Sequence, residues 1–326
     1  MIISRTPLRV SFFGGGSDLP AYYRRHGGAV LSTTIDQSVY ITVSRKFDNA
    51  VRVSYSRTEE VDHAGQVEHP LVREALAMLG IAGGIEITSI ADIPAKGTGL
   101  GSSSAFTVGL LNALHAYCGR HVPAEKLAQE SCTIEIERCG EPIGKQDQYA
   151  AAYGGFNFIR FHADERVEMN RLVCAPDILA ALQERLLFFY TGVTRSASEL
   201  LQRQTQEMTA SACKMKSMTD MVRLAETAYA ELCAGAVEPL GAMLDEAWQI
   251  KKRLTNGISN AIVDDAYQAA RDAGAAGGKL LGAGGGGFLM LYAPPERHAP
   301  VRRALSALRE VPFRFAPQGS SIIFVH

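Results

Sequence analysis

An excess of charge of either sign is missing from this chain. Its 326 residues include 33 Lys and Arg against 34 Asp and Glu, which gives a formal net charge of −1. A surface that holds a nucleic-acid backbone or an anionic membrane normally shifts this balance toward the basic side. We therefore expect no nucleic-acid partner and no membrane partner.

Long hydrophobic runs, a leader pattern and paired cysteines are also lacking. No apolar run approaches the roughly 18 residues that a membrane helix needs. The first residues, 1–5, lack the basic-then-apolar layout of a signal peptide. The six cysteines form no CxxC pair and have no metal-ligand spacing with histidine. We expect reduced thiols, no zinc site and a cytoplasmic location.

The chain has instead a loop crowded with glycine and serine, residues 94–105 (PAKGTGLGSSSA). A strand pattern at 84–90 precedes it, and an apolar helix-like run at 105–117 follows it. Glycine lets backbone N–H groups approach a ligand, and a helix start carries the positive end of the helix dipole. This order of strand, loop and helix predicts a phosphate cradle. The alternative interpretation is a glycine-rich turn that connects packed elements and binds nothing.

Two common nucleotide motifs are excluded by their context. In a P-loop the lysine follows the glycines, whereas Lys96 precedes them here. Residues 282–287 (GAGGGG) satisfy G-x-G-x-x-G, but a dinucleotide-binding fold needs a helix directly after that motif. The apolar run 288–292 is followed by two prolines and predicts a strand. The second glycine run therefore predicts a close backbone approach, either to a ligand or between packed elements.

Charged residues accompany these loops at the start and in the middle of the chain. Arg9 and a second arginine alternate around a proline and lead into a glycine turn that ends at Asp18. Arginine can neutralise phosphate and Asp18 can accept hydrogen bonds from hydroxyls; a surface strand with solvated arginines is the alternative. Asp147, in a polar loop, can orient or deprotonate a hydroxyl. Glu135 and Glu137 point about 200° apart on a helix, so only one can face a metal site.

Strand and helix patterns divide the chain into two parts. We expect strands at 8–13, 38–46, 51–56, 84–90, 154–160, 185–190, 288–292 and 321–325. We expect helices at 70–79, 105–117, 123–139, 197–233 with a break, 237–254, 262–273 and 295–308. The β-α-β order at the end predicts a small split sandwich. We expect an α+β protein with domains at 1–170 and 171–326.

Three of these segments, taken in order, resemble the motifs of the GHMP small-molecule kinases, the family of galactokinase, homoserine kinase, mevalonate kinase and phosphomevalonate kinase. Residues 5–10 with the turn 14–18 resemble the first motif, 94–105 the second and 279–288 the third. The resemblance implies an N-terminal domain like the second domain of ribosomal protein S5 and a ferredoxin-like C-terminal domain. It also implies that ATP binds between the two domains.

Matched position by position, the resemblance implies roles for individual residues. It implies that the ATP phosphates bind the second motif, at Pro94, Lys96, Gly97, Thr98, Gly99, Leu100, Gly101, Ser102, Ser103 and Ser104. It implies Mg²⁺ bound by Ser103 and Glu137, with Asp147 beside the acceptor hydroxyl and Arg9 near the transferring phosphoryl group. It implies substrate contacts from Gly15, Gly16, Ser17, Asp18, Arg195, Gly284 and Gly285.

Three stretches resemble a narrower branch of the family, the D-glycero-D-manno-heptose 7-phosphate kinases: residues 5–23, 144–155 (GKQDQYAAAYGG) and 190–201 (YTGVTRSASELL). This resemblance implies phosphorylation of the anomeric C1 hydroxyl to the 1,7-bisphosphate, a step toward nucleotide-activated heptose for surface glycans. A substrate that already carries a phosphate needs a cationic clamp. Arg195 is the first candidate for that clamp, followed by Arg24, Arg25 and Lys145.

Other substrates and one other class of function stay open. Galactokinase has Gly-Glu-His-Thr-Asp where residues 14–18 read Gly-Gly-Gly-Ser-Asp, which argues against galactose. Another sugar 1-kinase, such as a fucokinase or an N-acetylhexosamine kinase, is one alternative. A non-catalytic sugar sensor is the other, although the chain keeps the phosphate loop and Asp147. The sequence also leaves a homo-oligomer open.

Overall fold

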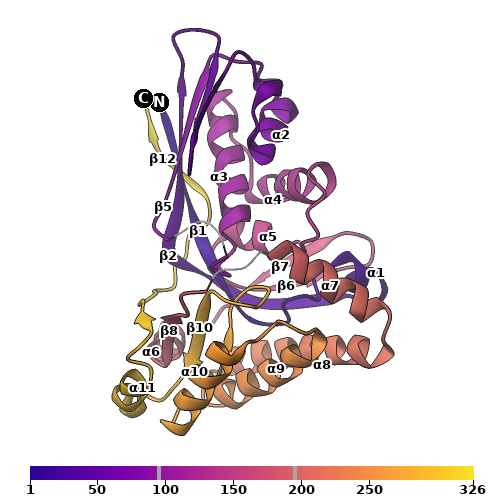
Figure 1. Ribbon diagram of the computed structural model, residues 1–326, viewed down its shortest axis with the longest axis vertical. Coiled ribbons are helices and arrows are strands. Elements are labelled where there is room, and N and C mark those ends of the chain that lie inside the picture. Colours follow the sequence, from indigo (N-terminus) through magenta and orange to yellow (C-terminus); the bar gives the residue numbers. More distant parts are fainter. Residues whose placement is uncertain (94–96, 194–196) are drawn as a thin grey trace.

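The computed structural model describes residues 1–93, 97–193 and 197–326, and it contains two β-sheets with helices packed against them (Figure 1). The strands are β1 (Ile2–Phe13), β2 (Gly28–Arg45), β3 (Val51–Ser54), β4 (Thr58–Val61), β5 (Ile85–Ala91), β6 (Phe156–Phe161), β7 (Val167–Arg171), β8 (Leu186–Tyr190), β9 (Gly277–Leu280), β10 (Phe288–Tyr292), β11 (Arg309–Glu310) and β12 (Ser321–Val325). The α-helices are α1 (Pro20–His26), α2 (Pro70–Leu79), α3 (Ser102–Tyr117), α4 (Ala124–Cys132), α5 (Gln146–Tyr153), α6 (Pro176–Glu184), α7 (Ala197–Thr209), α8 (Ala212–Cys233), α9 (Leu240–Leu254), α10 (Ala261–Asp272) and α11 (His298–Ala304). A π-helical turn, η2 (Thr133–Arg138), follows α4, and short 3₁₀ turns are η1 (Ala64–Gln66) and η3 (Pro295–Arg297).

The larger sheet has the strand order β12-β1-β2-β5-β3-β4, with β6 and β7 added beside β2. The long strand β2 pairs with β6 through residues 28–33 and with β5 through residues 39–45. The helix α3 packs across β1 and β2, and α2, α4 and α5 lie beside it on the same side (Figure 1). This arrangement buries α3 almost all round and fixes its N-terminus above the middle of β1.

The pairing of β1 with β2 is irregular where the site is built. Its register shifts between Pro7 and Arg9 and again between Ser11 and Phe13. The backbone N–H of Arg9 donates instead to the carbonyl of Leu100, at 3.0 Å. Because a bulge re-aims the side chains around it, this interruption connects β1 to the glycine loop that precedes α3.

The smaller sheet is antiparallel, with the order β11-β8-β10-β9. The helix α9 packs against β9 of the smaller sheet, and α8 packs against α9 and against β2 of the larger sheet (Figure 1). Strand β10 covers the run 288–292 that the sequence predicts as a strand. The α+β class is confirmed, and within the described ranges no helix is long and apolar enough to cross a membrane.

The chain returns to the larger sheet at its end. Strand β12 pairs antiparallel with β1, with Ile2 opposite Val325, and the N-terminal ammonium of Met1 donates to the carbonyl of His326 at 2.6 Å. The prediction that the last strand completes the C-terminal sandwich is therefore wrong. The apolar pattern of 321–325 predicts a strand but carries no information about its partner. The domain division at 170/171 stays a prediction.

One expected helix and one expected loop also need correction, whereas the break expected in the long helical segment is confirmed. The helix expected at 123–139 ends as α4 at Cys132 and continues as the π-helical turn η2. The residue expected in a polar loop, Asp147, is the second residue of α5. The break expected within 197–233 falls between α7 and α8, where the hydroxyl of Ser211 accepts a hydrogen bond from the backbone of Lys214.

Candidate active site

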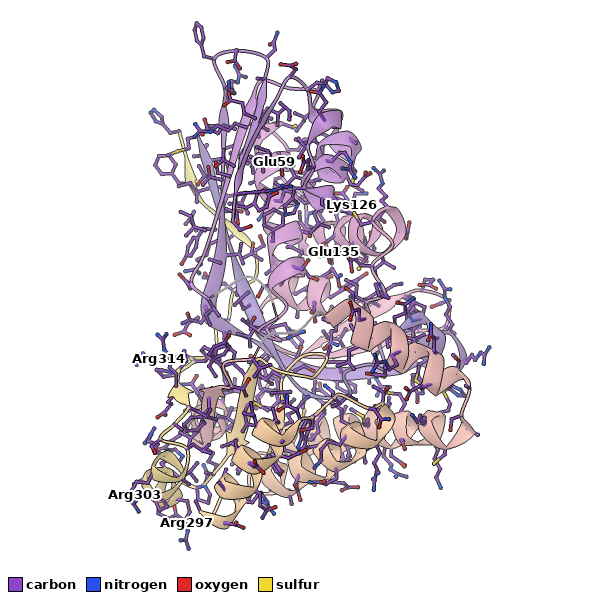
Figure 2. The ribbon with its side chains drawn as sticks, in the orientation of Figure 1. Glu59, Lys126, Glu135, Arg297, Arg303 and Arg314 are labelled. Atoms are coloured by element: carbon purple, nitrogen blue, oxygen red, sulfur yellow. The ribbon has the colours of Figure 1, made fainter. Side chains whose placement is uncertain are left out.

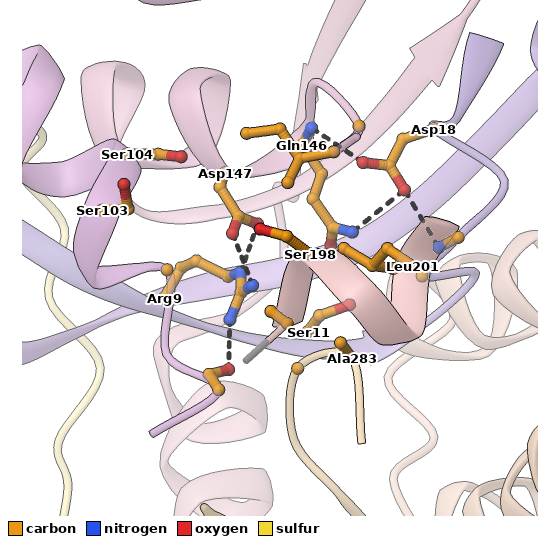
Figure 3. Close-up of a pocket in the computed structure, with 18 of the residues that line it drawn as sticks. Arg9, Ser11, Asp18, Ser103, Ser104, Gln146, Asp147, Ser198, Leu201 and Ala283 are labelled. Carbon is orange, nitrogen blue, oxygen red and sulfur yellow. Dashed lines mark hydrogen bonds and ion pairs between the residues drawn. The ribbon is translucent and has the colours of Figure 1, made fainter. Parts of the chain in front are cut away.

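A cavity of about 640 Å³ lies where the two sheets approach each other. Segments that are far apart in the sequence form its wall (Figure 3). They are residues of β1, the turn 14–19, the loop 97–104, the loop 141–147, α7, α9, β9 and the glycine run after it. All three segments singled out in the sequence therefore meet at one cavity.

The glycine and serine loop bends tightly and then starts α3. Gly97, Gly99 and Gly101 have φ angles of 72°, 78° and 75°, which side chains other than glycine rarely adopt. No side chain caps the first turn of α3 within the described residues, so its N–H groups remain available to an anion. Seven residues of the loop line the cavity: Gly97, Thr98, Gly99, Gly101, Ser102, Ser103 and Ser104.

One of the predicted phosphate contacts falls elsewhere, and two others lie outside the described residues. Leu100 is fully buried, and its carbonyl accepts the hydrogen bond from Arg9. Its role is therefore to anchor the loop to β1. Pro94 and Lys96 lie outside the described residues.

The second glycine run supports this loop from below. A Cβ on Gly99 would lie 2.4 Å from the carbonyl oxygen of Leu281, and one on Gly282 would lie 2.4 Å from the Cα of Gly99. A Cβ on Gly287 would lie 2.4 Å from the carbonyl oxygen of Thr98. The two loops therefore contact each other backbone to backbone, which explains the cluster of glycines.

The two glycines of this run that the sequence predicts as substrate contacts do not line the cavity. The cavity wall here consists of Gly282 and Ala283. Gly284 and Gly285 turn toward Ile258, whose carbonyl accepts a hydrogen bond from the N–H of Gly285 at 2.9 Å. They hold the run against the segment before α10.

Arg9 and Asp147 form a bidentate ion pair at the centre of the cavity (Figure 3). Nε of Arg9 donates to Oδ1 of Asp147 at 2.6 Å, and Nη2 donates to Oδ2 at 2.7 Å. Nη1 donates to the carbonyl of Gly99 at 2.6 Å. Arginine has five N–H donors, so two remain for a ligand. The arrangement fixes a carboxylate and a cation side by side at the foot of the phosphate loop.

Asp18 is the second carboxylate of the cavity and is almost fully buried. Its Oδ1 accepts hydrogen bonds from the N–H of Gly16 and from Nε2 of Gln146, both at 3.0 Å, and its Oδ2 accepts from the N–H of Gln146 at 3.1 Å. Burial raises the pKa of Asp18 above its ordinary value, and the nearby charge of Asp147 adds to this.

The turn before Asp18 is only partly available to a substrate. Gly15 and Gly16 line the cavity. The predicted contact Ser17 does not: its hydroxyl donates to the carbonyl of Ala29 and accepts from the N–H of the same residue. Ser17 therefore fastens the turn to β2.

Glu135, and not Glu137, lies beside the serine loop. Glu135 sits in the π-helical turn, fully buried close to α3 and α5 (Figure 2). Its carboxylate accepts four hydrogen bonds, from the hydroxyls of Ser103, Ser104 and Thr107 at 3.1, 2.8 and 3.0 Å and from Nε2 of Gln148 at 2.5 Å.

The metal-ligand prediction for Glu137 is therefore wrong. Its side chain is exposed to solvent, because residues two positions apart on a helix face opposite sides. The resemblance identified the helix but not the face that points to the loop. Glu135 is the carboxylate within reach of Ser103.

The predicted cationic clamp is not assembled by the described residues. Arg195 lies outside them. Arg24 and Lys145 both bind the carboxylate of Glu165 at the surface, and Arg25 is exposed.

Sequence reasoning missed two lysines of the cavity wall, Lys251 of α9 and Lys279 of β9. A signal was present for Lys251. It falls on the buried stripe of α9 formed by Leu240, Leu244, Ala247 and Leu254, a spacing of 4-3-4-3 in which a charged residue is out of place.

We expect the pH dependence of stability to reveal the buried carboxyl group of Glu135. Burial raises the pKa of Glu135 from 4.5 to about 7 in the folded protein. Between those values the unfolded chain loses the proton while the folded protein keeps it, so stability falls as pH rises and the full penalty applies above pH 7. For Glu135→Gln in metal-free buffer, the penalty of about 3 kcal/mol disappears.

The measurement is the midpoint of thermal unfolding at pH 5 and at pH 8. The fall in unfolding temperature from pH 5 to pH 8 should be smaller for Glu135→Gln than for the unmodified protein. Glu137→Gln, an exposed carboxyl of the same turn, is the matched control and should leave the drop unchanged. An equal drop in all three proteins contradicts the assignment of Glu135.

Comparisons with known proteins agree with this geometry. The model for the N-terminal domain of GHMP kinases matches residues 67–155, and the model for their C-terminal domain matches residues 228–311. Together the two matches cover more than half of the chain.

Relatives share both the sequence and the fold. The chain is 28% identical over 326 residues to D-glycero-alpha-D-manno-heptose 7-phosphate kinase of Campylobacter jejuni, covering 93% of each protein. It is 26% identical over 321 residues to the bifunctional fucokinase/GDP-fucose pyrophosphorylase of Arabidopsis thaliana, covering 91% of this chain and 30% of that protein. The crystal structure of a D-glycero-D-manno-heptose 1-phosphate kinase from Bacteroides thetaiotaomicron matches with a TM-score of 0.82 at 26% identity, over 100% of both chains.

These matches confirm the fold and the reaction class that the three motifs predict. Both domain models fall in the expected order, and the loop 97–104 inside the N-terminal match forms the wall of the cavity. The chain belongs to the GHMP kinases, a family of phosphotransferases.

Proposed function

We propose that the protein transfers the γ-phosphoryl group of ATP to the anomeric C1 hydroxyl of D-glycero-D-manno-heptose 7-phosphate, which gives the 1,7-bisphosphate. The observation that carries the proposal is the Arg9–Asp147 pair at the foot of the glycine and serine loop. A phosphate-binding loop and a carboxylate that can receive a hydroxyl proton are the two parts that such a transfer needs. The similarity to the named heptose 7-phosphate kinase supports the choice of sugar.

Binding of the nucleotide falls to the loop 97–104. Its exposed N–H groups and the positive end of the α3 dipole attract the phosphate oxygens. The backbone contact with Gly282 and Gly287 holds the loop in place before ATP arrives. Such preorganisation stabilises the charge of the transition state without a reorganisation cost at the moment of transfer.

The two charged residues of the pair have distinct tasks. Asp147 orients the C1 hydroxyl and accepts its proton, since Arg9 fixes both oxygens of the carboxylate. The two remaining N–H groups of Arg9 donate to oxygens of the transferring phosphoryl group. Asp18, held by Gln146, accepts a hydrogen bond from a sugar hydroxyl.

The donor set near the loop fits Mg²⁺. Within the described ranges, no group of three or more His, Cys, Asp or Glu side chains is placed to hold a metal alone. Mg²⁺ typically takes one or two carboxylates and completes its shell with phosphate oxygens and water. Ser103 and Glu135 offer a hydroxyl and a carboxylate at that place. When bound with ATP, the ion neutralises phosphate charge.

A fucokinase is the second candidate. It is favoured by the 26% identity to the Arabidopsis protein over nearly the whole of this chain, which spans about a third of that protein. The acceptor is again an anomeric hydroxyl, so the same Arg9–Asp147 pair serves. The two candidates differ only in whether the sugar already carries a phosphate.

The test of the substrate is an ATP-consumption assay with Mg²⁺ and a panel of sugars: heptose 7-phosphate, mannose 6-phosphate, mannose, fucose and galactose. We expect the highest kcat/KM with heptose 7-phosphate and a 1,7-bisphosphate product identified by ³¹P nuclear magnetic resonance. Preference for fucose supports the second candidate. No turnover with any sugar in the panel contradicts both.

We expect Asp147→Asn to lower kcat by roughly 10²–10⁴-fold, because the amide cannot accept the hydroxyl proton. Binding of ATP, measured by calorimetry, should change little because the loop is intact. Asp177→Asn is the matched control: Asp177 is also the second residue of its helix, α6, but is exposed. Near-normal turnover of Asp147→Asn rules out its role as the base.

A further inference from the structure

Two lysine side chains are buried in the wall of the catalytic cavity, and the mechanism above does not use them. Lys251 of α9 is 5% exposed and Lys279 of β9 is 3% exposed. Nζ of Lys251 donates to the carbonyl of Gly282 at 2.5 Å. Nζ of Lys279 donates to the carbonyls of Ser11 and Phe12 at 2.8 and 3.1 Å. Both ammonium groups are therefore held by backbone oxygens.

Neither lysine has an acidic partner among the residues that the structure describes. The acids of the cavity wall already have other partners: Asp147 binds Arg9, Asp18 accepts from Gly16 and Gln146, and Glu141 accepts from the hydroxyl of Ser198. Arg9, Lys251 and Lys279 are therefore three basic side chains of the cavity wall, and among the described residues only Arg9 forms an ion pair with one of its acids.

Burial and like charge act on both ammonium groups. Burial lowers the pKa of Lys251 to about 8; the charge of Arg9 adds to this effect, and the charge of Asp18 opposes it. Burial also lowers the pKa of Lys279, well below its ordinary value, and the charges of Lys251 and Arg9 add to this effect. Buried charges without a counter-ion cost several kcal/mol in a folded protein, so such a cluster indicates a site for an anionic ligand.

The position of the lysines points to the phosphate end of the cavity. The carbonyl that holds Lys251 belongs to Gly282, which contacts Gly99 of the phosphate loop. The carbonyl of Gly99 in turn accepts the hydrogen bond from Arg9. When protonated, as a bound phosphate favours, a lysine amino group has three N–H donors, so Lys251 then keeps two and Lys279 keeps one beyond the backbone bonds given above.

We propose that Lys251 and Lys279 form a second phosphate-binding site of the cavity, beside Gly282 and the end of β1. Their remaining N–H donors bind oxygens of a phosphate group. That group is either the γ-phosphoryl of ATP or the phosphate that the sugar already carries. The choice of these two candidates rests on the proposed function. The two lysines thus supply the cationic clamp that the surface residues Arg24 and Lys145 do not.

The test is binding, measured by calorimetry without turnover. The variants are Lys251→Met and Lys279→Met, which keep the length of the side chain and remove the charge. Lys252→Met is the matched control, because Lys252 is the next residue on α9 and pairs with Asp264 outside the cavity. The probes are inorganic phosphate, ADP, the non-hydrolysable ATP analogue AMPPNP, mannose and mannose 6-phosphate.

We expect both variants to lose affinity for inorganic phosphate by about tenfold or more, as removal of a charge-assisted hydrogen bond does, while Lys252→Met does not. A loss for AMPPNP but not for ADP identifies the γ-phosphoryl group as the ligand. A loss for mannose 6-phosphate but not for mannose identifies the phosphate of the sugar. Unchanged affinity of both variants for all probes overturns the proposal.

Stability separates a binding role from a structural one. Because the lysines are buried without a counter-ion, the ligand-free variants should unfold at the same temperature as the unmodified protein or higher. If Lys279→Met unfolds at a lower temperature than the unmodified protein, the binding results for Lys251→Met decide between the two roles, because that variant loses only one hydrogen bond to the backbone. Failure of every sugar in the kinase assay overturns the proposed function but leaves these binding results valid.

Discussion

The site depends on Arg9, which connects three of the segments that form it. Its backbone N–H binds Leu100 and its guanidinium binds both Gly99 and Asp147, so β1, the phosphate loop and α5 are connected through one side chain and one bulge. Guanidinium is suited to this because its donors lie in a fixed plane and match a carboxylate in two places. The loop has no side chains at its glycine bends, so the guanidinium of Arg9 and the backbone contact with the second glycine run help to hold it in place.

Charge separates the cavity into two halves. On one side, Glu135 is buried beneath Ser103 and Ser104, with a carboxyl group that resists ionisation until a cation arrives. On the other side lie Arg9, which is paired with Asp147, and two buried lysines, Lys251 and Lys279, which form no ion pair among the described residues. Under the proposed function, a magnesium nucleotide brings a cation to Glu135 and phosphate oxygens to the basic side chains, and its binding stabilises the folded protein.

The sequence was sufficient for the parts of the site that lie on one short segment. The glycine pattern gave the loop and the start of α3, and the order of motifs gave Arg9, Asp18 and Asp147. The sequence was insufficient where the outcome depends on which face of a helix carries a residue or on which partner a side chain binds. The π-helical turn determines that Glu135 and not Glu137 points to the loop, and the turn hydrogen bond to Ala29 takes Ser17 away from the cavity.

Long-range pairing escaped the sequence for the same reason. Residues 321–325 have the pattern of a strand, but only the free edge of β1 explains why they join the first sheet. Lys251 appears in the sequence as one of three consecutive basic residues, 251–253, and only the packing of α9 shows which of them is buried. A helical stripe with one charged position among leucines and alanine was the signal that pattern analysis could have used.

The central claim is that residues 97–104 and 282–287 act as one phosphate-binding unit, in which the two segments contact each other through their backbones and Arg9 ties the first to β1. Backbone hydrogen exchange with and without Mg²⁺ and AMPPNP tests it most directly. The account predicts that exchange slows in both segments together, because the nucleotide binds the first and the first rests on the second. Slowed exchange elsewhere, with both segments unchanged, would contradict it.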